Sequence, residues 1–168
     1  MKLSRNFTLA EMVKSNTAKR LGISNVPTEK NVESLRYLTT LGIQKFRDRF
    51  GPIRVSSGFR SVKLCEAVGS SRRSFHAQGQ AADIECMSEG TSNLELVLWA
   101  YDNLEFTELI AEYFDRDDEK GGWVHYALAE GREQENVLKL KDGEHDYEIV
   151  SIEYLKNLYG VVDDKVRT

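Results

Sequence analysis

The sequence predicts an α+β fold in which a small antiparallel sheet is packed against helices from the N-terminal part of the chain. Helix signals dominate the beginning of the chain, whereas short runs of alternating apolar and polar residues, which are typical of strands, follow later. A chain of 168 residues has the size of one compact domain. We therefore expect a single domain over 1–168.

The N-terminal helices are indicated by their capping residues. Thr8 and Glu11 have the spacing of a capping box, which predicts a short helix that runs to about Arg20. A longer helix is expected to begin at Thr28 and to end at Gly51-Pro52. Its apolar residues keep an approximately helical spacing: Val32, Leu35, Leu38, Leu41 and Phe46.

The later part of the chain alternates between strand and helix signals. Strands are expected at 53–57, 81–86, 107–114, 123–128, 137–140 and 147–150. Shorter helices are expected at 61–68, 93–104 and 151–159. Asp142-Gly143 is a typical hairpin dipeptide, so the last two strands are expected to be joined by a turn.

The charge balance argues against a nucleic-acid partner. The chain has 23 Lys+Arg and 27 Asp+Glu, a net charge of -4, and so lacks the basic excess that phosphate backbones require. No apolar run is long enough to span a bilayer, and the N-terminus lacks the apolar segment of a secretory signal. We expect a monomer without stable membrane association that is made in the cytoplasm without a signal peptide.

Two of the three histidines lie in patterned surroundings. His76 begins the pattern His-x-x-Gly-x-Ala-x-Asp that ends at Asp83, and His125 follows Trp-Val. Imidazole nitrogens and carboxylate oxygens bind zinc at about 2.0–2.2 Å, and three such ligands leave a fourth position for water, as in catalytic zinc sites. The alternative is that His76 is a loop residue and that His125 is a core residue bonded to a carbonyl.

The stretch from Phe7 to about Leu138 resembles the zinc D-alanyl-D-alanine carboxypeptidase family, in particular its branch of small phage and bacterial peptidoglycan peptidases. This family is related to the hedgehog-type and D-Ala-D-Ala dipeptidase zinc folds. The matching segments occur in order along the chain: FTLAEM (7–12), SNTAKRLGI (15–23), GPIRVSSGFRS (51–61), SFHAQGQAAD (74–83), LIAE (109–112) and GWVH (122–125). The region of about 139–168 would be a C-terminal hairpin and helix extension of this core.

The resemblance implies a set of site residues. His76, Asp83 and His125 would bind Zn²⁺ at the surface of the sheet. The Arg60 guanidinium would bind a substrate carboxylate or the oxyanion that develops on the scissile carbonyl, and Ser74 would hydrogen-bond a ligand or the substrate. A structural salt bridge is the alternative for Arg60, and capping of its own loop is the alternative for Ser74.

The general base departs from the usual family pattern. Many relatives have a glutamate three residues before the last histidine, where this chain has Gly122. Glu112 instead matches the glutamate of the Leu-Ile-x-Glu segment, on the strand before His125. Pairing of Glu112 with Trp123 or His125 would direct its carboxylate toward the metal, whereas pairing with Val124 would direct it away. The alternative is an exposed strand carboxylate without a catalytic role.

The resemblance implies a zinc peptidase that hydrolyses peptidoglycan stem peptides next to D-amino acids. The enzyme would be a carboxypeptidase or an endopeptidase, and it would act on the cell wall after release or as a component of a phage virion. A zinc protein without catalysis and a phage structural or assembly protein are the alternatives. Arg72 and Arg73, before the first motif, are either attractants for stem-peptide carboxylates or solvated loop charges.

Overall fold

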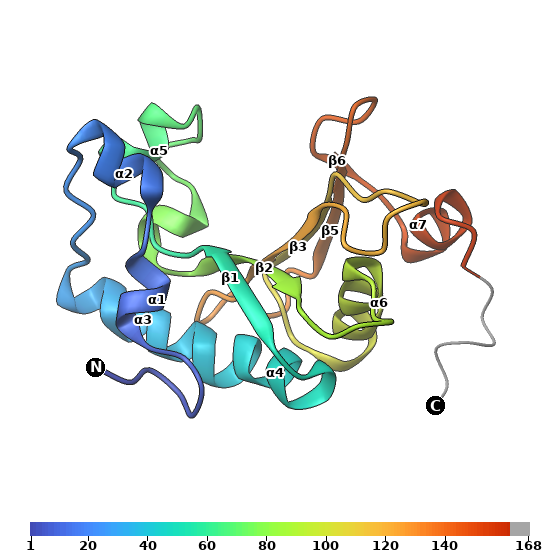
Figure 1. The fold of residues 1–168 in the computed structure, drawn as a ribbon, viewed down its shortest axis with the longest axis horizontal. Coiled ribbons are helices and arrows are strands. Elements are labelled where there is room, and N and C mark those ends of the chain that lie inside the picture. Colours follow the sequence, from blue (N-terminus) through green and yellow to red (C-terminus); the bar gives the residue numbers. More distant parts are fainter. Residues whose placement is uncertain (162–168) are drawn as a thin grey trace.

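The computed structural model describes residues 1–161, which form a six-stranded sheet and the helices around it (Figure 1). The strand order is β1-β2-β4-β3-β5-β6. The strands are β1 (Ile53–Ser57), β2 (Ala81–Cys86), β3 (Glu108–Glu112), β4 (Trp123–Ala127), β5 (Val137–Lys141) and β6 (Glu148–Ile149). Neighbouring strands are antiparallel except β3 and β5, which are parallel. The predicted α+β class is confirmed, with a sheet that is mostly rather than entirely antiparallel.

Four of the α-helices precede the first strand in the sequence, as predicted, and the other α-helices lie between or after the strands. They are α1 (Leu9–Val13), α2 (Asn16–Leu21), α3 (Glu29–Leu38), a π-helical turn (Thr39–Ile43), α4 (Gln44–Phe50), α5 (Val62–Ala67), a 3₁₀ helix (Phe75–Gln78), α6 (Asn93–Asn103) and α7 (Ile152–Leu158). The capping boxes at Thr8 and Thr28 are both present. The expected long helix is a continuous helical run in which the π-helical turn joins α3 to α4.

The first predicted helix is in fact two helices, because the chain becomes extended at Lys14. The carbonyl oxygen of Met12 accepts a hydrogen bond from the Phe59 backbone at 2.7 Å, and that of Val13 accepts one from the Asn25 side chain at 2.8 Å. These contacts with distant segments replace helical hydrogen bonds at the end of α1. The capping box therefore predicted the start of this helix correctly but gave no information about its end.

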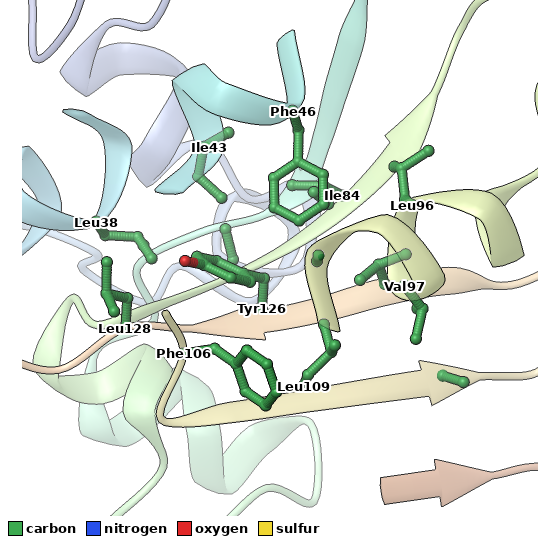
Figure 2. Packing of buried hydrophobic residues seen from close by; sticks show 14 of the residues in the cluster. Leu38, Ile43, Phe46, Ile84, Leu96, Val97, Phe106, Leu109, Tyr126 and Leu128 are labelled. Atoms are coloured by element: carbon green, nitrogen blue, oxygen red, sulfur yellow. The ribbon is translucent and has the colours of Figure 1, made fainter. Parts of the chain in front are cut away.

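The sheet has one apolar face, which packs against α4 and α6 to form the core (Figure 2). Ile84 of β2, Tyr126 of β4 and Leu109 of β3 are fully buried on this face. The Phe46 ring of α4 makes an edge contact with the Tyr126 ring at a centroid distance of 5.2 Å. Because side chains alternate between the faces of a strand, the residues between these apolar positions point to the opposite face.

The C-terminal region belongs to the same sheet. β5 crosses the boundary at 138/139 that the resemblance suggested, and the expected hairpin and final helix are formed by β5, β6 and α7. Residues 162–168, the end of the expected extension, lie outside the described residues. Within the described chain, none of the helices combines the length and the apolar character that crossing a membrane requires.

We expect Phe46→Ala to lower the free energy of unfolding by about 3–5 kcal/mol, because the lost ring leaves a cavity beside Tyr126. Urea denaturation followed by tryptophan fluorescence would measure this change. Val26→Ala is the control, since Val26 is 77% exposed and its truncation is expected to change stability by no more than about 0.5 kcal/mol. Equal effects of the two substitutions would contradict the assignment of the core.

Candidate metal centre

Three separate elements bring His76, Asp83 and His125 together on the face of the sheet opposite the core. His76 lies in the 3₁₀ helix, Asp83 lies on β2, and His125 lies opposite Asp83 on β4. The Ser74 hydroxyl caps the 3₁₀ helix by accepting a hydrogen bond from the His76 backbone at 3.2 Å. Gly79 ends this helix in the left-handed conformation, with φ 72°, which is readily available to glycine.

The three side chains present one donor atom each toward a common point. His76 Nε2 lies 3.2 Å from Asp83 Oδ1, Asp83 Oδ1 lies 3.0 Å from His125 Nδ1, and the two nitrogens are 3.2 Å apart. Ligand atoms of a tetrahedral zinc ion, with bonds of about 2.0–2.1 Å, are about 3.3 Å from one another. The triangle of donor atoms therefore has the size of one face of a zinc tetrahedron.

The two imidazoles of the triad differ in their hydrogen bonds and in their protonation. His76 Nδ1 lies 2.7 Å from the Gly58 carbonyl oxygen, so this nitrogen carries the proton and Nε2 has a free lone pair. Burial lowers the pKa of His76, which also favours its neutral form. Burial opposes protonation of His125 too, but the hydrogen bond with Asp83 and the nearby Glu108 raise its pKa to about 9. In the metal-free cluster His125 is therefore protonated, and its positive charge takes the place of a metal cation.

Arg60 holds the second oxygen of the Asp83 carboxylate. Its guanidinium donates to Asp83 Oδ2 at 2.6 Å and to the Ser57 hydroxyl at 2.7 Å. This contact fixes the carboxylate so that Oδ1 faces the two imidazoles. The structural salt bridge considered as the alternative for Arg60 is therefore present, while a contact between Arg60 and substrate stays a prediction.

Glu108 is a residue of this cluster that the sequence reasoning missed. Its Oε1 lies 3.3 Å from His125 Nε2, which is buried without a hydrogen bond of good geometry, and its other oxygen binds the Lys139 ammonium. Burial would raise the pKa of Glu108, but His125 and Lys139 lower it to about 2, so the carboxylate stays charged. An anion at this position holds the His125 ring with Nδ1 toward the triad, as carboxylates behind metal-bound histidines do.

Glu112 lies on the same face of the sheet as the triad. It pairs with Trp123 across β3 and β4, one of the two registers expected to direct its carboxylate toward the metal. The residue is only 6% exposed, so the alternative of an exposed strand carboxylate does not hold. Burial, aided by the negative charge of Asp83, raises the pKa of Glu112 to about 7. A carboxylate with this pKa can both accept and donate a proton near neutral pH.

Gly122 cannot be replaced by the glutamate that many relatives have at this position. Its φ is +65°, and a Cβ atom built there would lie 2.1 Å from the Glu112 carbonyl oxygen. At this point the backbone segments of the β3–β4 hairpin are thus too close to each other to leave room for a side chain. Among the described residues that line the cleft, the only carboxylates besides Asp83 are Glu108 and Glu112.

We expect Gly122→Ala to lower the free energy of unfolding by more than about 2 kcal/mol, since it adds a steric clash to a left-handed conformation. Gly131→Ala is the matched control, because Gly131 has φ +82° but no atom within 4 Å of the added Cβ, and a loss of about 1 kcal/mol is expected. Chemical denaturation would measure both. Equal losses would show that the hairpin can open to admit a side chain.

The pKa of Glu112 predicts a pH dependence of stability for the metal-free protein. A folded-state pKa of about 7, above the ordinary value of 4.5, stabilises the fold below pH 4.5, and this contribution is lost as the pH rises through 7. The loss reaches about 3 kcal/mol by pH 8. Glu112→Gln removes the ionisation, so the free energy of unfolding of this variant should rise relative to that of the wild type between pH 5 and 8. Urea denaturation in the presence of a chelator would measure this difference. Parallel pH profiles would contradict this pKa.

Comparison with known proteins identifies the family. Residues 5–115 match the family model of peptidase M15, so the matched stretch ends before His125. The chain is also 31% identical over 129 residues to the zinc D-Ala-D-Ala carboxypeptidase of Streptomyces albus G, a match that covers 76% of this chain and 47% of the relative. It thus spans about half the length of this curated relative. The match with the family model and this identity together show that the chain belongs to the M15 peptidases, the family of the zinc D-Ala-D-Ala carboxypeptidase.

Proposed function

We propose that this chain is a zinc-dependent peptidase that hydrolyses peptidoglycan stem peptides next to D-amino acids. The observation that carries the proposal is the triangle of donor atoms with a buried glutamate in the same cleft. Family membership indicates Zn²⁺ as the cofactor, and His76, Asp83 and His125 would hold it. Zinc bound there would supply a water of lowered pKa and a positive charge for the scissile carbonyl oxygen.

Glu112 is proposed to be the general base. Its carboxylate would accept the proton of the attacking water and then give this proton to the leaving amine nitrogen. The register of the strands supports this role, because Glu112 lies opposite Trp123 on the face of the sheet that carries the three zinc donors and lines the same cleft. The cleft would also shield the carboxylate from solvent, since Glu112 is almost fully buried.

Arg60 and Ser74 are proposed to bind substrate. Both line the cleft that contains the triad, and both already make contacts that hold a metal ligand in place. The guanidinium has further N–H groups beyond those used by Asp83 and Ser57, and these could bind a substrate carboxylate or the developing oxyanion. Ser74 could donate its hydroxyl proton to substrate while its oxygen continues to cap the 3₁₀ helix.

We propose that the enzyme acts on the bacterial cell wall. The resemblance to the small phage and bacterial peptidoglycan peptidases supports a role in phage lysis, in a virion or in a bacterial wall. The buried Glu112 beside a complete set of zinc donors favours an active enzyme over a zinc protein without catalysis and over a structural component.

We expect Glu112→Gln to retain one zinc per chain and to lose peptidoglycan hydrolysis by about a hundredfold or more, because the amide cannot accept the proton of water. Metal analysis and the appearance of new amino groups, with and without a chelator, would measure the two properties. His76→Ala should lose zinc, whereas His145→Ala should keep it, since His145 contacts Asp142 and Tyr154 instead. Hydrolysis at the wild-type rate by zinc-loaded Glu112→Gln would overturn the assignment of the base.

A further inference from the structure

The cleft that contains the triad continues across the sheet in both directions. It has a volume of about 1040 Å³. The ligand strands β2 and β4 are neighbours within the sheet, with β1 on one side of them and β3 and β5 on the other. The cleft is lined on one side of the triad by β1 residues such as Ser57, and on the other side by Glu112 of β3 and Lys139 of β5. The cleft therefore extends to both sides of the triad, and the larger part of its lining lies on the β1 side.

Structural elements from opposite ends of the sheet form the walls of this cleft. α2 and α5 rise beyond β1, and the hairpin of β5 and β6 rises on the opposite side (Figure 1). Asn16 of α2 and Leu64 of α5 line the cleft at the first end, and Tyr147 of the hairpin lines it at the second. Residues on both sides of a scissile bond at the triad would thus have a wall to contact.

The two ends of the cleft differ in charge. We call the part lined by residues from 14–17, 54–60 and 64–75 the β1 arm. Among its described lining residues are four cations, Lys14, Arg54, Arg60 and Arg73, and no carboxylate. This excess of positive charge occurs in a chain whose net charge is -4. A segment bound in this arm would therefore be attracted if it carried negative charge.

Two of these cations have no acidic partner of their own. Arg54 is paired with Glu85, and Arg60 is paired with Asp83. Lys14 and Arg73, by contrast, make no ion pair with any residue in the described part of the chain. The structure also separates the two neighbouring arginines, because Arg73 lines the cleft while Arg72 lies outside it and pairs with Glu66 at 3.3 Å.

We propose that the β1 arm binds a carboxylate-bearing segment of a peptide that continues through the triad, so that this chain cleaves acidic peptides at an internal bond. The inference rests on the proposed hydrolase function. It narrows that function from a carboxypeptidase or an endopeptidase to an endopeptidase. Release of a terminal residue would need a single carboxylate contact, for which Arg60 beside Asp83 suffices. Lys14 and Arg73 provide further charge for carboxylates on residues away from the scissile bond.

Synthetic stem peptides with both ends blocked, by N-terminal acetylation and C-terminal amidation, provide the test. One peptide keeps its side-chain carboxylates and its partner has them converted to amides. The zinc-loaded enzyme should cleave the acidic peptide internally, with a kcat/KM about tenfold above that of the amide form. Lys14→Gln and Arg73→Gln should each reduce this preference several-fold. Arg72→Gln, the matched control, should leave it unchanged.

The possible outcomes separate the inference from the function on which it rests. Loss of a terminal residue from unblocked peptides, with blocked ones left intact, would overturn the inference and keep the hydrolase. An acid-to-amide preference that survives in Arg73→Gln would also overturn it. If no zinc-dependent hydrolysis of peptidoglycan occurs, the proposed function fails. Calorimetric measurement of the binding of the same two peptides to Glu112→Gln then tests whether the β1 arm binds carboxylates. Equal affinities for the two peptides would then reject the arm as a carboxylate site.

Discussion

The arrangement of the site depends on the Asp83 carboxylate, which is shared between two sets of partners. One of its oxygens faces both imidazoles, and the other accepts a hydrogen bond from Arg60. Burial alone would raise the pKa of Asp83, but the two histidines hold it well below its ordinary range. The carboxylate is therefore a permanent anion around which the other groups are oriented. The Arg60 guanidinium and the protonated His125 each compensate for part of the cost of burying that negative charge.

The alternation of side chains along the strands separates this polar cluster from the core. On β4, His125 faces the site while its neighbours Val124 and Tyr126 are buried on the opposite face. On β3, Glu108 and Glu112 face the site while Leu109 and Ala111 enter the core. A shift of one residue in the pairing of β3 and β4 would reverse these assignments and would bury carboxylates among apolar side chains. The apolar core thus fixes the register on which the geometry of the site depends.

The sequence was sufficient to predict much of the fold and part of the site. Strand alternation and capping boxes located most elements, and the patterns around His76 and His125 indicated three candidate metal ligands whose donor atoms converge in the structure. Glu108 was missed even though it lies two residues before Ile110 and four before Glu112 on the same strand, a spacing that could have revealed it. Lys139 could not have been found in this way, because its contact with Glu108 depends on parallel pairing of β3 with β5. The break at Lys14 likewise depends on contacts with distant segments.

The C-terminal strands β5 and β6 form a wall of the cleft, and they also determine which strand lies at this edge of the sheet. β5 takes up the free backbone groups of β3, so the strand that carries both site glutamates is an interior strand. The sheet then ends at β6, which has only two residues, Glu148 and Ile149, and offers few open hydrogen-bonding groups to another chain. The region that follows the family match therefore shortens the open edge on this side of the sheet, whereas β1 forms the opposite edge. The same short hairpin thus limits strand addition at one edge of the sheet and also shapes the cleft through Tyr147.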